Sequence, residues 1–233
     1  MSMAGFKRAL IVGAGSGLSA SLARKFAAEG LDVALAARDP DKLAGLCAET
    51  GAMSFAVDAA DPTEVEGLFE AVDVSLGVPD VVVYNASYRV RGPFETLDAE
   101  KVARTLAVTA YGAFLVAQQA TRRMLPHNHG AILLTGASAG VKGYKQSAPF
   151  AMGKFALRGM AQSMARELSP KGIHVAHFVI DGAIRSASRQ ESADNPDSML
   201  DPAAIADSYW HVLNQPRSAW AWEIELRPWV ENF

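Results

Sequence analysis

A glycine-rich turn near the start of the chain carries the first chemical signal of the sequence. It reads Val12-Gly-Ala-Gly-Ser-Gly-Leu18 and separates a short apolar run, residues 9–12, from a helical pattern over residues 18–29. Small residues in such a turn let the backbone approach a pyrophosphate, and the first N–H groups of the following helix point their positive dipole at that anion. A tight turn without a ligand is the alternative. The spacing favours a dinucleotide site, with the pyrophosphate held at Gly13, Ser16, Gly17 and Leu18.

The residues after the second apolar run bear on the identity of the dinucleotide. A chain that binds NAD usually places a carboxylate there, which holds both hydroxyls of the adenosine ribose. Here Ala37 is followed by Arg38, and the first acid is Asp39. A guanidinium offers a planar fork to a 2′-phosphate. We therefore expect NADP(H) to be preferred over NAD(H), unless Arg38 is only a solvated surface side chain.

One lysine lies on the apolar face of a predicted helix over residues 150–168. That face is formed by Phe150, Leu157, Ala161, Met164 and Leu168, at helical spacing. Lys154 lies between the first two of these residues. A buried ammonium is costly unless it is hydrogen-bonded, and the hydroxyls of a nucleotide ribose would satisfy it. The alternative is that the side chain extends along the helix to water.

The elements that must position these residues alternate along the chain. Strands are predicted over residues 9–12, 33–36, 53–57, 81–84, 131–135, 174–180 and 222–226. Helices are predicted over residues 18–29, 39–47, 98–125, 150–168 and 202–213, with a further one beginning at Asp61-Pro62. Strands that alternate with helices and are apolar on both faces predict a parallel sheet covered on both sides.

The pattern thus predicts one α/β domain over residues 1–233, a Rossmann-type doubly wound fold with a seven-stranded parallel sheet. Ligands of such sheets bind beyond the carboxyl ends of the strands. Residues 186–199 are polar and weakly periodic, which favours a mobile loop or a helical lid. With the helix that follows, they form a predicted substrate-side segment over residues 186–213.

Composition argues against several classes of protein. The 233 residues are 50% hydrophobic and 20% charged with a net charge of −3, which is ordinary for a soluble protein and unfavourable for nucleic acid or an anionic membrane. A single cysteine, Cys47, excludes a disulfide within the chain, and the five histidines lack metal-ligand spacing. No uncharged apolar stretch approaches the roughly 18 residues of a membrane span. We expect a cytoplasmic protein without a metal, a nucleic-acid partner or membrane contact.

Together these motifs resemble the short-chain dehydrogenase/reductase family, from Ala9 to about Pro228. The turn Gly13-x-x-x-Gly17-x-Ser19 is similar to the family's Gly-x-x-x-Gly-x-Gly, and Asn85-Ala86-Ser87 is similar to its Asn-Ala-Gly. The resemblance implies the fold and a dinucleotide cofactor. It also implies contacts to that cofactor from Asp58 and Ala59 at the adenine, from Asn85 and Ala86, from Lys154 at the nicotinamide ribose, and from Ile184 at the nicotinamide.

The catalytic pattern that the resemblance implies is altered in this sequence. The family uses Tyr-x-x-x-Lys, in which the tyrosine exchanges a proton while hydride passes to or from the nicotinamide. Here the motif reads Phe150-Ala-Met-Gly-Lys154, and phenylalanine has no proton to transfer. The positions of the family's serine and asparagine fall on Ala137 and Thr109. Of the four catalytic residue types, only Lys154 is clearly kept.

Ser138 and Tyr144 are the candidates for the missing catalytic groups. Ser138 directly follows Ala137, and Tyr144 lies in the loop before the helix of Lys154. A phenol whose pKa is lowered by Lys154 is a workable general acid. Tyr88 is a second phenol that follows the Asn-Ala-Ser motif, and the alternative for both is ordinary packing.

Two functions remain open from the sequence. One is an oxidoreductase that acts on an unknown carbonyl or alcohol substrate with a non-standard proton donor. The other is a catalytically inactive dinucleotide-binding protein, such as a redox sensor or an assembly partner. By analogy with the family we also expect a homodimer or homotetramer.

Overall fold

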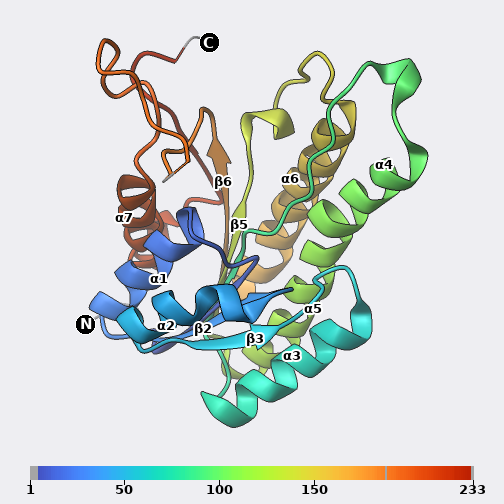
Figure 1. Ribbon diagram of the computed structural model, residues 1–233. Helices are drawn as coiled ribbons and strands as arrows, with labels where there is room; N and C mark the ends of the chain where they lie inside the picture. Colours follow the sequence, from blue (N-terminus) through green and yellow to red (C-terminus); the bar gives the residue numbers. More distant parts are fainter. Residues whose placement is uncertain (1–4, 187, 232–233) are drawn as a thin grey trace.

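Apolar strands form one parallel sheet at the centre of the computed structural model, which describes residues 5–186 and 188–231 (Figure 1). Within that part of the chain the strands are β1 (Arg8–Val12), β2 (Asp32–Ala37), β3 (Met53–Ala56), β4 (Val81–Tyr84), β5 (Gly130–Thr135), β6 (Ile173–Ile180) and β7 (Glu223–Leu226). They run in the order β3-β2-β1-β4-β5-β6-β7, and all neighbours are parallel. The predicted doubly wound fold with seven parallel strands is confirmed.

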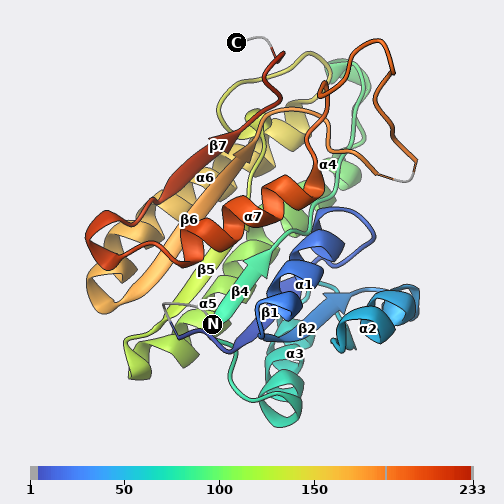
Figure 2. The ribbon, with the colours of Figure 1, turned by 90° about the vertical axis from the view of Figure 1, so that its left-hand side faces the viewer.

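Helices cover both faces of this sheet, as Figures 1 and 2 show from two sides. One face carries α1 (Leu18–Ala28), α2 (Ala44–Thr50) and α7 (Pro202–Leu213). The other carries α3 (Pro62–Ser75), α4 (Ala99–Leu106), α5 (Gly112–Met124) and α6 (Ala148–Leu168). Each face has its own apolar core, which explains why β4, β5 and β6 are buried along their whole length.

Short 3-10 turns connect several of these elements. They cover Pro40–Leu43, Phe94–Thr96, Leu125–His127, Ser138–Gly140, Ser169–Lys171 and Arg217–Ala219. Among the described helices, none combines the length and the apolar character that crossing a bilayer requires.

The helix predicted over residues 98–125 is interrupted in the structure. Residues Ala107–Tyr111 form a π-helical turn between α4 and α5. The buried phenol of Tyr84 donates a hydrogen bond to the carbonyl of Val108 in this turn. A side chain on Gly112 would collide with that same phenol oxygen, at 2.5 Å. The widened turn is therefore fixed by a strand residue that helical periodicity alone does not show.

The segment over residues 186–199 contains no helix among its described residues, so the helical-lid alternative is not what the structure shows there. Single β-bridges organise it instead. Ile184 pairs with Leu200 in parallel, and Ser186 pairs with Arg189 in antiparallel fashion. The segment follows β6 in the chain and therefore lies at the carboxyl end of the sheet (Figure 1).

Candidate functional site

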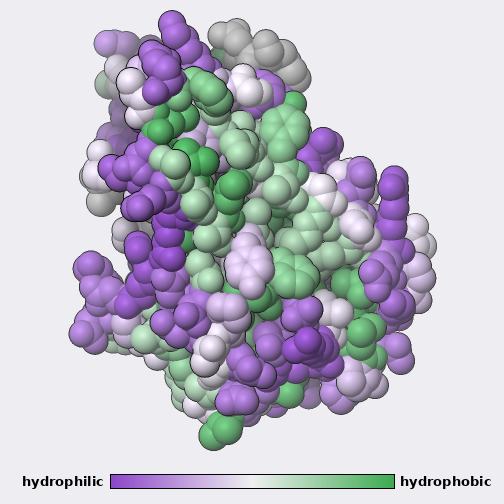
Figure 3. Space-filling model, turned by 90° about the vertical axis from the view of Figure 1, so that its right-hand side faces the viewer, coloured by the Kyte–Doolittle hydropathy of each residue, from purple (hydrophilic) through white to green (hydrophobic). Residues whose placement is uncertain are grey.

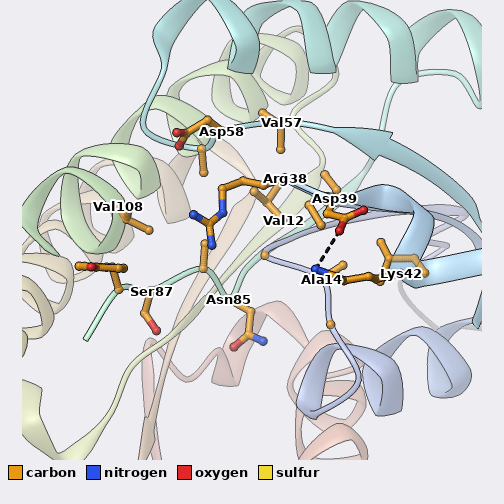
Figure 4. Close-up of a pocket in the computed structure, with 18 of the residues that line it drawn as sticks. Val12, Ala14, Arg38, Asp39, Lys42, Val57, Asp58, Asn85, Ser87 and Val108 are labelled. Atoms are coloured by element: carbon orange, nitrogen blue, oxygen red, sulfur yellow. Dashed lines mark ion pairs between the residues drawn. The ribbon is translucent and has the colours of Figure 1, made fainter. Parts of the chain in front are cut away.

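A cavity of about 520 Å³ opens where β1, β2, β3 and β4 end (Figure 4). Its walls are residues 12–16, 36–39, 42–43, 57–59, 85–88 and 108. The order of the sheet reverses between β1 and β4, and such a switch point is where ligands of open α/β sheets bind. Seven residues predicted from the sequence line this cavity: Gly13, Ser16, Arg38, Asp58, Ala59, Asn85 and Ala86.

Four other residues predicted to contact the cofactor lie outside this lining, as do the catalytic candidates Ser138 and Tyr144. Gly17 is the N-cap of α1, and Leu18 is the buried first residue of that helix. Lys154 is buried on α6, and Ile184 is half-buried in its bridge with Leu200.

The glycine turn is held against the segment after β4 by a very close backbone contact. Gly13 has a φ of 86°, and a Cβ at this position would lie 2.3 Å from the amide nitrogen of Ala86. Only glycine fits both constraints. By contrast, a Cβ on Gly15 would meet nothing within 4 Å, so this part of the turn faces open space.

Ser19, which replaces the family's last glycine, ties the turn to its surroundings. Its buried hydroxyl donates to the carbonyl of Gly13 at 3.0 Å and accepts from the amide of Asn85 at 2.7 Å. No side chain caps the N-terminus of α1. The first N–H groups of this helix thus remain available to an anion at the turn.

Arg38 reaches into the cavity, and Asp39 lines the same cavity, where it is paired with Lys42 (Figure 4). The carboxylate of Asp39 lies 2.8 Å from the ammonium of Lys42, and this hydrogen bond lowers the pKa of Asp39. No ion pair joins Arg38 to an acid within the described ranges. The guanidinium of Arg38 therefore faces the cavity without an ion pair, although its charge contributes to the lowered pKa of Asp58 in the same cavity.

Asp58 is paired with Arg104 of α4, a partner that sequence reasoning missed. Its Oδ2 lies 2.5 Å from a guanidinium nitrogen of Arg104, and its Oδ1 accepts the backbone N–H of Ala60 at 3.0 Å. Burial acts to raise the pKa of Asp58, but these two hydrogen bonds and the charges of Arg104 and Arg38 together outweigh it, so the pKa falls below its usual range. Arg104 lies 46 residues away along the chain, so no local motif points to it.

Lys154 is almost wholly buried, so its side chain does not extend along the helix to water. Its side chain belongs to a residue only 4% exposed, and its ammonium donates to the carbonyl of Thr135 at 2.7 Å. Burial disfavours the charged form and lowers the pKa of Lys154 to about 8. An ammonium has three donors, and the Thr135 carbonyl accepts from one of them.

The two candidates for the missing catalytic groups contact each other. The phenol of Tyr144 donates to the hydroxyl of Ser138 at 2.8 Å. Lys142 lies beside them, with its ammonium 5.7 Å from the centre of the Tyr144 ring and 3.5 Å from the carboxylate of Asp181. A hydrogen bond to Tyr144 raises the pKa of Lys142. Tyr144 is 42% exposed, so its phenol is accessible to a small molecule.

Phe150 has two cations against its ring. The ammonium of Lys154 lies 5.7 Å from the ring centre, and the guanidinium carbon of Arg89 lies 5.0 Å from it. Arg89 was not predicted as a site residue. Its position three residues after the Ala86 contact was the available signal, because a segment that follows a central strand reaches the ligand edge of the sheet.

Comparisons with known proteins agree with this geometry. The family model described as short chain dehydrogenase matches residues 7–197. The solved short-chain dehydrogenase from Rhodopseudomonas palustris is 36% identical, with a TM-score of 0.82, over 96% of this chain and 99% of that one. An uncharacterised oxidoreductase of Staphylococcus aureus is 27% identical over 95% of this chain and 97% of its own.

A third similar protein is a polyketide ketoreductase. A single-residue variant of the actinorhodin polyketide ketoreductase was solved with NADPH, and it superposes with a TM-score of 0.89 over 100% of both chains. At 22% identity this likeness shows the fold alone.

Burial of Lys154 gives stability a defined pH dependence. A lysine whose pKa is about 8 when folded and 10.5 when unfolded destabilises the fold by up to about 3 kcal/mol below pH 8. The effect disappears as pH rises through 10.5. We therefore predict that Lys154→Met is more stable than the unmodified chain at pH 7, and that this advantage shrinks below about 1 kcal/mol at pH 10.

Urea denaturation at the two pH values measures the difference. Lys101→Met, at an exposed lysine of α4, is the matched control and should show no such trend. The prediction is contradicted if the change in the free energy of unfolding caused by Lys154→Met is no more favourable at pH 7 than at pH 10.

Proposed function

Because the chain belongs to the short-chain dehydrogenase family, we propose that it binds NADP(H) and acts as an oxidoreductase on a carbonyl or alcohol substrate. The observation that carries the proposal is the cavity at the switch point of the sheet. There the glycine turn after β1, Arg38 after β2, Asp58 after β3 and Asn85 after β4 meet around one space. NADP(H), when bound, supplies or accepts the hydride.

Each part of the cavity has a role in holding the dinucleotide. The uncapped N-terminus of α1 and the open side of Gly15 suit the pyrophosphate. The guanidinium of Arg38, which has no ion pair among the described residues, suits a 2′-phosphate, and the Asp39 carboxylate is already in contact with Lys42. Asp58, kept ionised by Arg104, accepts a hydrogen bond from the adenine amino group. Lys154 donates its remaining N–H groups to the nicotinamide ribose, and Ile184 borders the nicotinamide.

Proton transfer in this proposal belongs to the Tyr144–Ser138 pair. In the direction of reduction, the Tyr144 O–H turns from Ser138 to the substrate oxygen and gives its proton there. The Ser138 hydroxyl then donates its own hydrogen bond to the phenolate oxygen. The nearby Lys142 ammonium stabilises the phenolate that remains. Phe150 takes no part, because it has no exchangeable proton.

A second candidate function is dinucleotide binding without turnover, as in a redox sensor or an assembly partner. It is favoured by the joint replacement of three catalytic residue types, at Phe150, Ala137 and Thr109. The structure adds that Thr109 is buried against Gly153 of α6, so it is not free to act on a substrate.

Cofactor choice is tested by titrating the purified protein with NADPH and NADH while following nicotinamide fluorescence. We predict tighter binding of NADPH. Arg38→Gln should weaken NADPH binding about tenfold or more and leave NADH unchanged, because it removes charged hydrogen bonds to one phosphate only. Arg122→Gln, at an exposed arginine of α5, is the control. Binding of neither nucleotide would overturn the proposed function.

The proton donor is tested with matched tyrosine variants. Tyr144→Phe should lower kcat about a hundredfold or more with any carbonyl substrate that is turned over, as expected for loss of a general acid. Tyr88→Phe removes a phenol that lines the cavity and should leave kcat close to that of the unmodified chain. Phe150→Tyr should raise turnover. NADPH binding without turnover by the unmodified chain and by all three variants would favour the second candidate.

We also propose that a second copy of the chain covers an apolar surface on α5, α6 and the π-helical turn. Four exposed residues form this surface: Tyr111, Phe114, Met152 and Phe155. Tyr111 and Phe114 stack on each other with ring centres 6.2 Å apart. Figure 3 shows apolar side chains gathered on this side of the molecule. Contiguous exposed apolar residues of this kind mark interaction surfaces.

If a second copy covers this surface, we predict a mass in solution of at least twice the 24.7 kDa of one chain. Light scattering after size exclusion measures it. Phe114→Glu should shift the mass toward that of the monomer, because it buries a charge in the interface. Val74→Glu, at an apolar side chain of α3 that is 90% exposed, should leave the mass unchanged. A monomeric mass for the unmodified chain would contradict the prediction.

A further inference from the structure

Three exposed arginines that have no ion-pair partner among the described residues lie on segments at the carboxyl end of the sheet, and one of them contacts Phe150. Arg89 and Arg91 lie on the segment after β4, and Arg189 lies on the segment after β6. Of the eleven other arginines in the described residues, six form ion pairs with carboxylates: Arg24, Arg104, Arg123, Arg158, Arg185 and Arg227. The other five, which do not contact Phe150, form none: Arg8, Arg38, Arg122, Arg166 and Arg217. No such pair involves Arg89, Arg91 or Arg189 in that part of the chain. We call these three residues the arginine cluster.

The contrast is sharpest within one short segment. Arg185 is held by Glu191 at 3.1 Å and by Asp201 at 2.6 Å. Arg189, four residues further on, has no carboxylate partner in the described ranges. Glu191 and Asp201 thus neutralise Arg185, whereas the charge of Arg189 is left without a carboxylate among the described residues.

Arg89 stands beside the position at which the family has its proton donor. Its guanidinium carbon lies 5.0 Å from the centre of the Phe150 ring. The ammonium of Lys154 lies 5.7 Å from the same ring centre. None of the three arginines lines the 520 Å³ cavity that suits the adenosine half of the dinucleotide. The cluster is therefore separate from the site of the 2′-phosphate at Arg38.

The backbone that carries the cluster is fixed by hydrogen bonds. The N–H of Tyr88 donates to the hydroxyl of Thr109 at 3.4 Å, and the N–H of Gly92 donates to the carbonyl of Gln146 at 3.1 Å. These two bonds bracket Arg89 and Arg91. Ser186 and Arg189 exchange backbone hydrogen bonds of 2.9 and 3.1 Å. Both segments emerge at the carboxyl end of the sheet (Figures 1 and 2).

The three positive charges act on one another. Burial and then the charges of Arg91 and Arg189 lower the pKa of Arg89. Like charges held together without a counter-ion are unfavourable, and an anion placed among them relieves this repulsion. A guanidinium also matches the two oxygens of a carboxylate or phosphate in a bidentate fashion.

We propose that the substrate carries an oxyanion group, a carboxylate or a phosphate monoester, and that Arg89 binds this group with Arg91 and Arg189 around it. The proposal rests on the proposed function and names the substrate class for the same cleft. Arg89 then sets specificity by holding the anionic end of the substrate while the carbonyl or alcohol lies toward Tyr144 and Ser138.

The test compares anionic aldehydes with neutral counterparts as substrates of the NADPH-loaded protein. The carboxylate pair is 4-carboxybenzaldehyde against methyl 4-formylbenzoate, and the phosphate pair is glyceraldehyde 3-phosphate against glyceraldehyde. We expect kcat/KM to favour the anionic member of at least one pair about tenfold or more, and the preference to fall as salt rises. The pair that shows the larger preference identifies the anion.

Arg89→Gln should reduce that preference about tenfold or more and leave kcat/KM for the neutral aldehydes unchanged. Arg189→Gln should reduce it in the same direction. Arg166→Gln, at an exposed arginine of α6, is the control and should keep it. Equal kcat/KM for anionic and neutral members of both pairs, or equal effects of Arg89→Gln and Arg166→Gln, would overturn the proposal.

A binding measurement separates this proposal from the proposed function. Calorimetric titration with terephthalate and with glycerol 3-phosphate needs neither turnover nor nucleotide. Saturable binding of one of these anions that Arg89→Gln abolishes supports the anion site even if no aldehyde is reduced. Absence of binding of both anions, in a protein that does bind NADPH and reduces neutral aldehydes, would refute the anion site and leave the proposed function standing.

Discussion

The close approach of Gly13 to Ala86 is the constraint on which the rest of the site depends. No side chain fits between these two backbones, and the amides of Gly13 and Ala14 both donate to the carbonyl of Ala36 at 2.9 Å. The amide of Asn85 donates to the carbonyl of Val12 at 2.8 Å. Three strand ends, those of β1, β2 and β4, are thus joined at a single point. The cavity that holds Arg38 and Asn85 exists because this junction fixes where each strand stops.

The sequence was sufficient wherever a feature is local. The glycine turn, the apolar strands and the apolar face around Lys154 follow from residue types and their spacing, and the structure shows a strand, helix or turn at each of these places. It was insufficient where two distant elements meet. The π-helical turn depends on the Tyr84 phenol from β4, and the charge of Asp58 depends on Arg104 from α4. Arg89 gains its position only because the segment after β4 folds onto Phe150 of α6.

The loss of a phenol at position 150 is consistent with the charges around it. The Lys154 ammonium and the Arg89 guanidinium both face the Phe150 ring, and an aromatic ring attracts cations by about 0.5–2 kcal/mol each. The ring thereby offsets part of the cost of burying Lys154. Lys154 still donates a hydrogen bond to the Thr135 carbonyl, but its other neighbour here is the carbon ring of Phe150, which has no exchangeable proton. Any proton that moves must therefore come from a different element, and the Tyr144–Ser138 hydrogen bond lies on the neighbouring loop after β5.

The two halves of the cleft rest on different parts of the fold, and this explains how one half can change while the other is kept. The adenosine half is built from the ends of β1 to β4, where the Gly13 contact and the Ser19–Asn85 bond leave little freedom. The reacting half is built from α6 and from the segments after β4, β5 and β6, whose side chains are more exposed. A substitution such as tyrosine to phenylalanine at position 150 leaves every contact of the first half in place. In the proposed function, the adenosine contacts and proton transfer therefore rest on different residues, and Arg89, which lies beside Phe150, belongs to the half that is free to specialise.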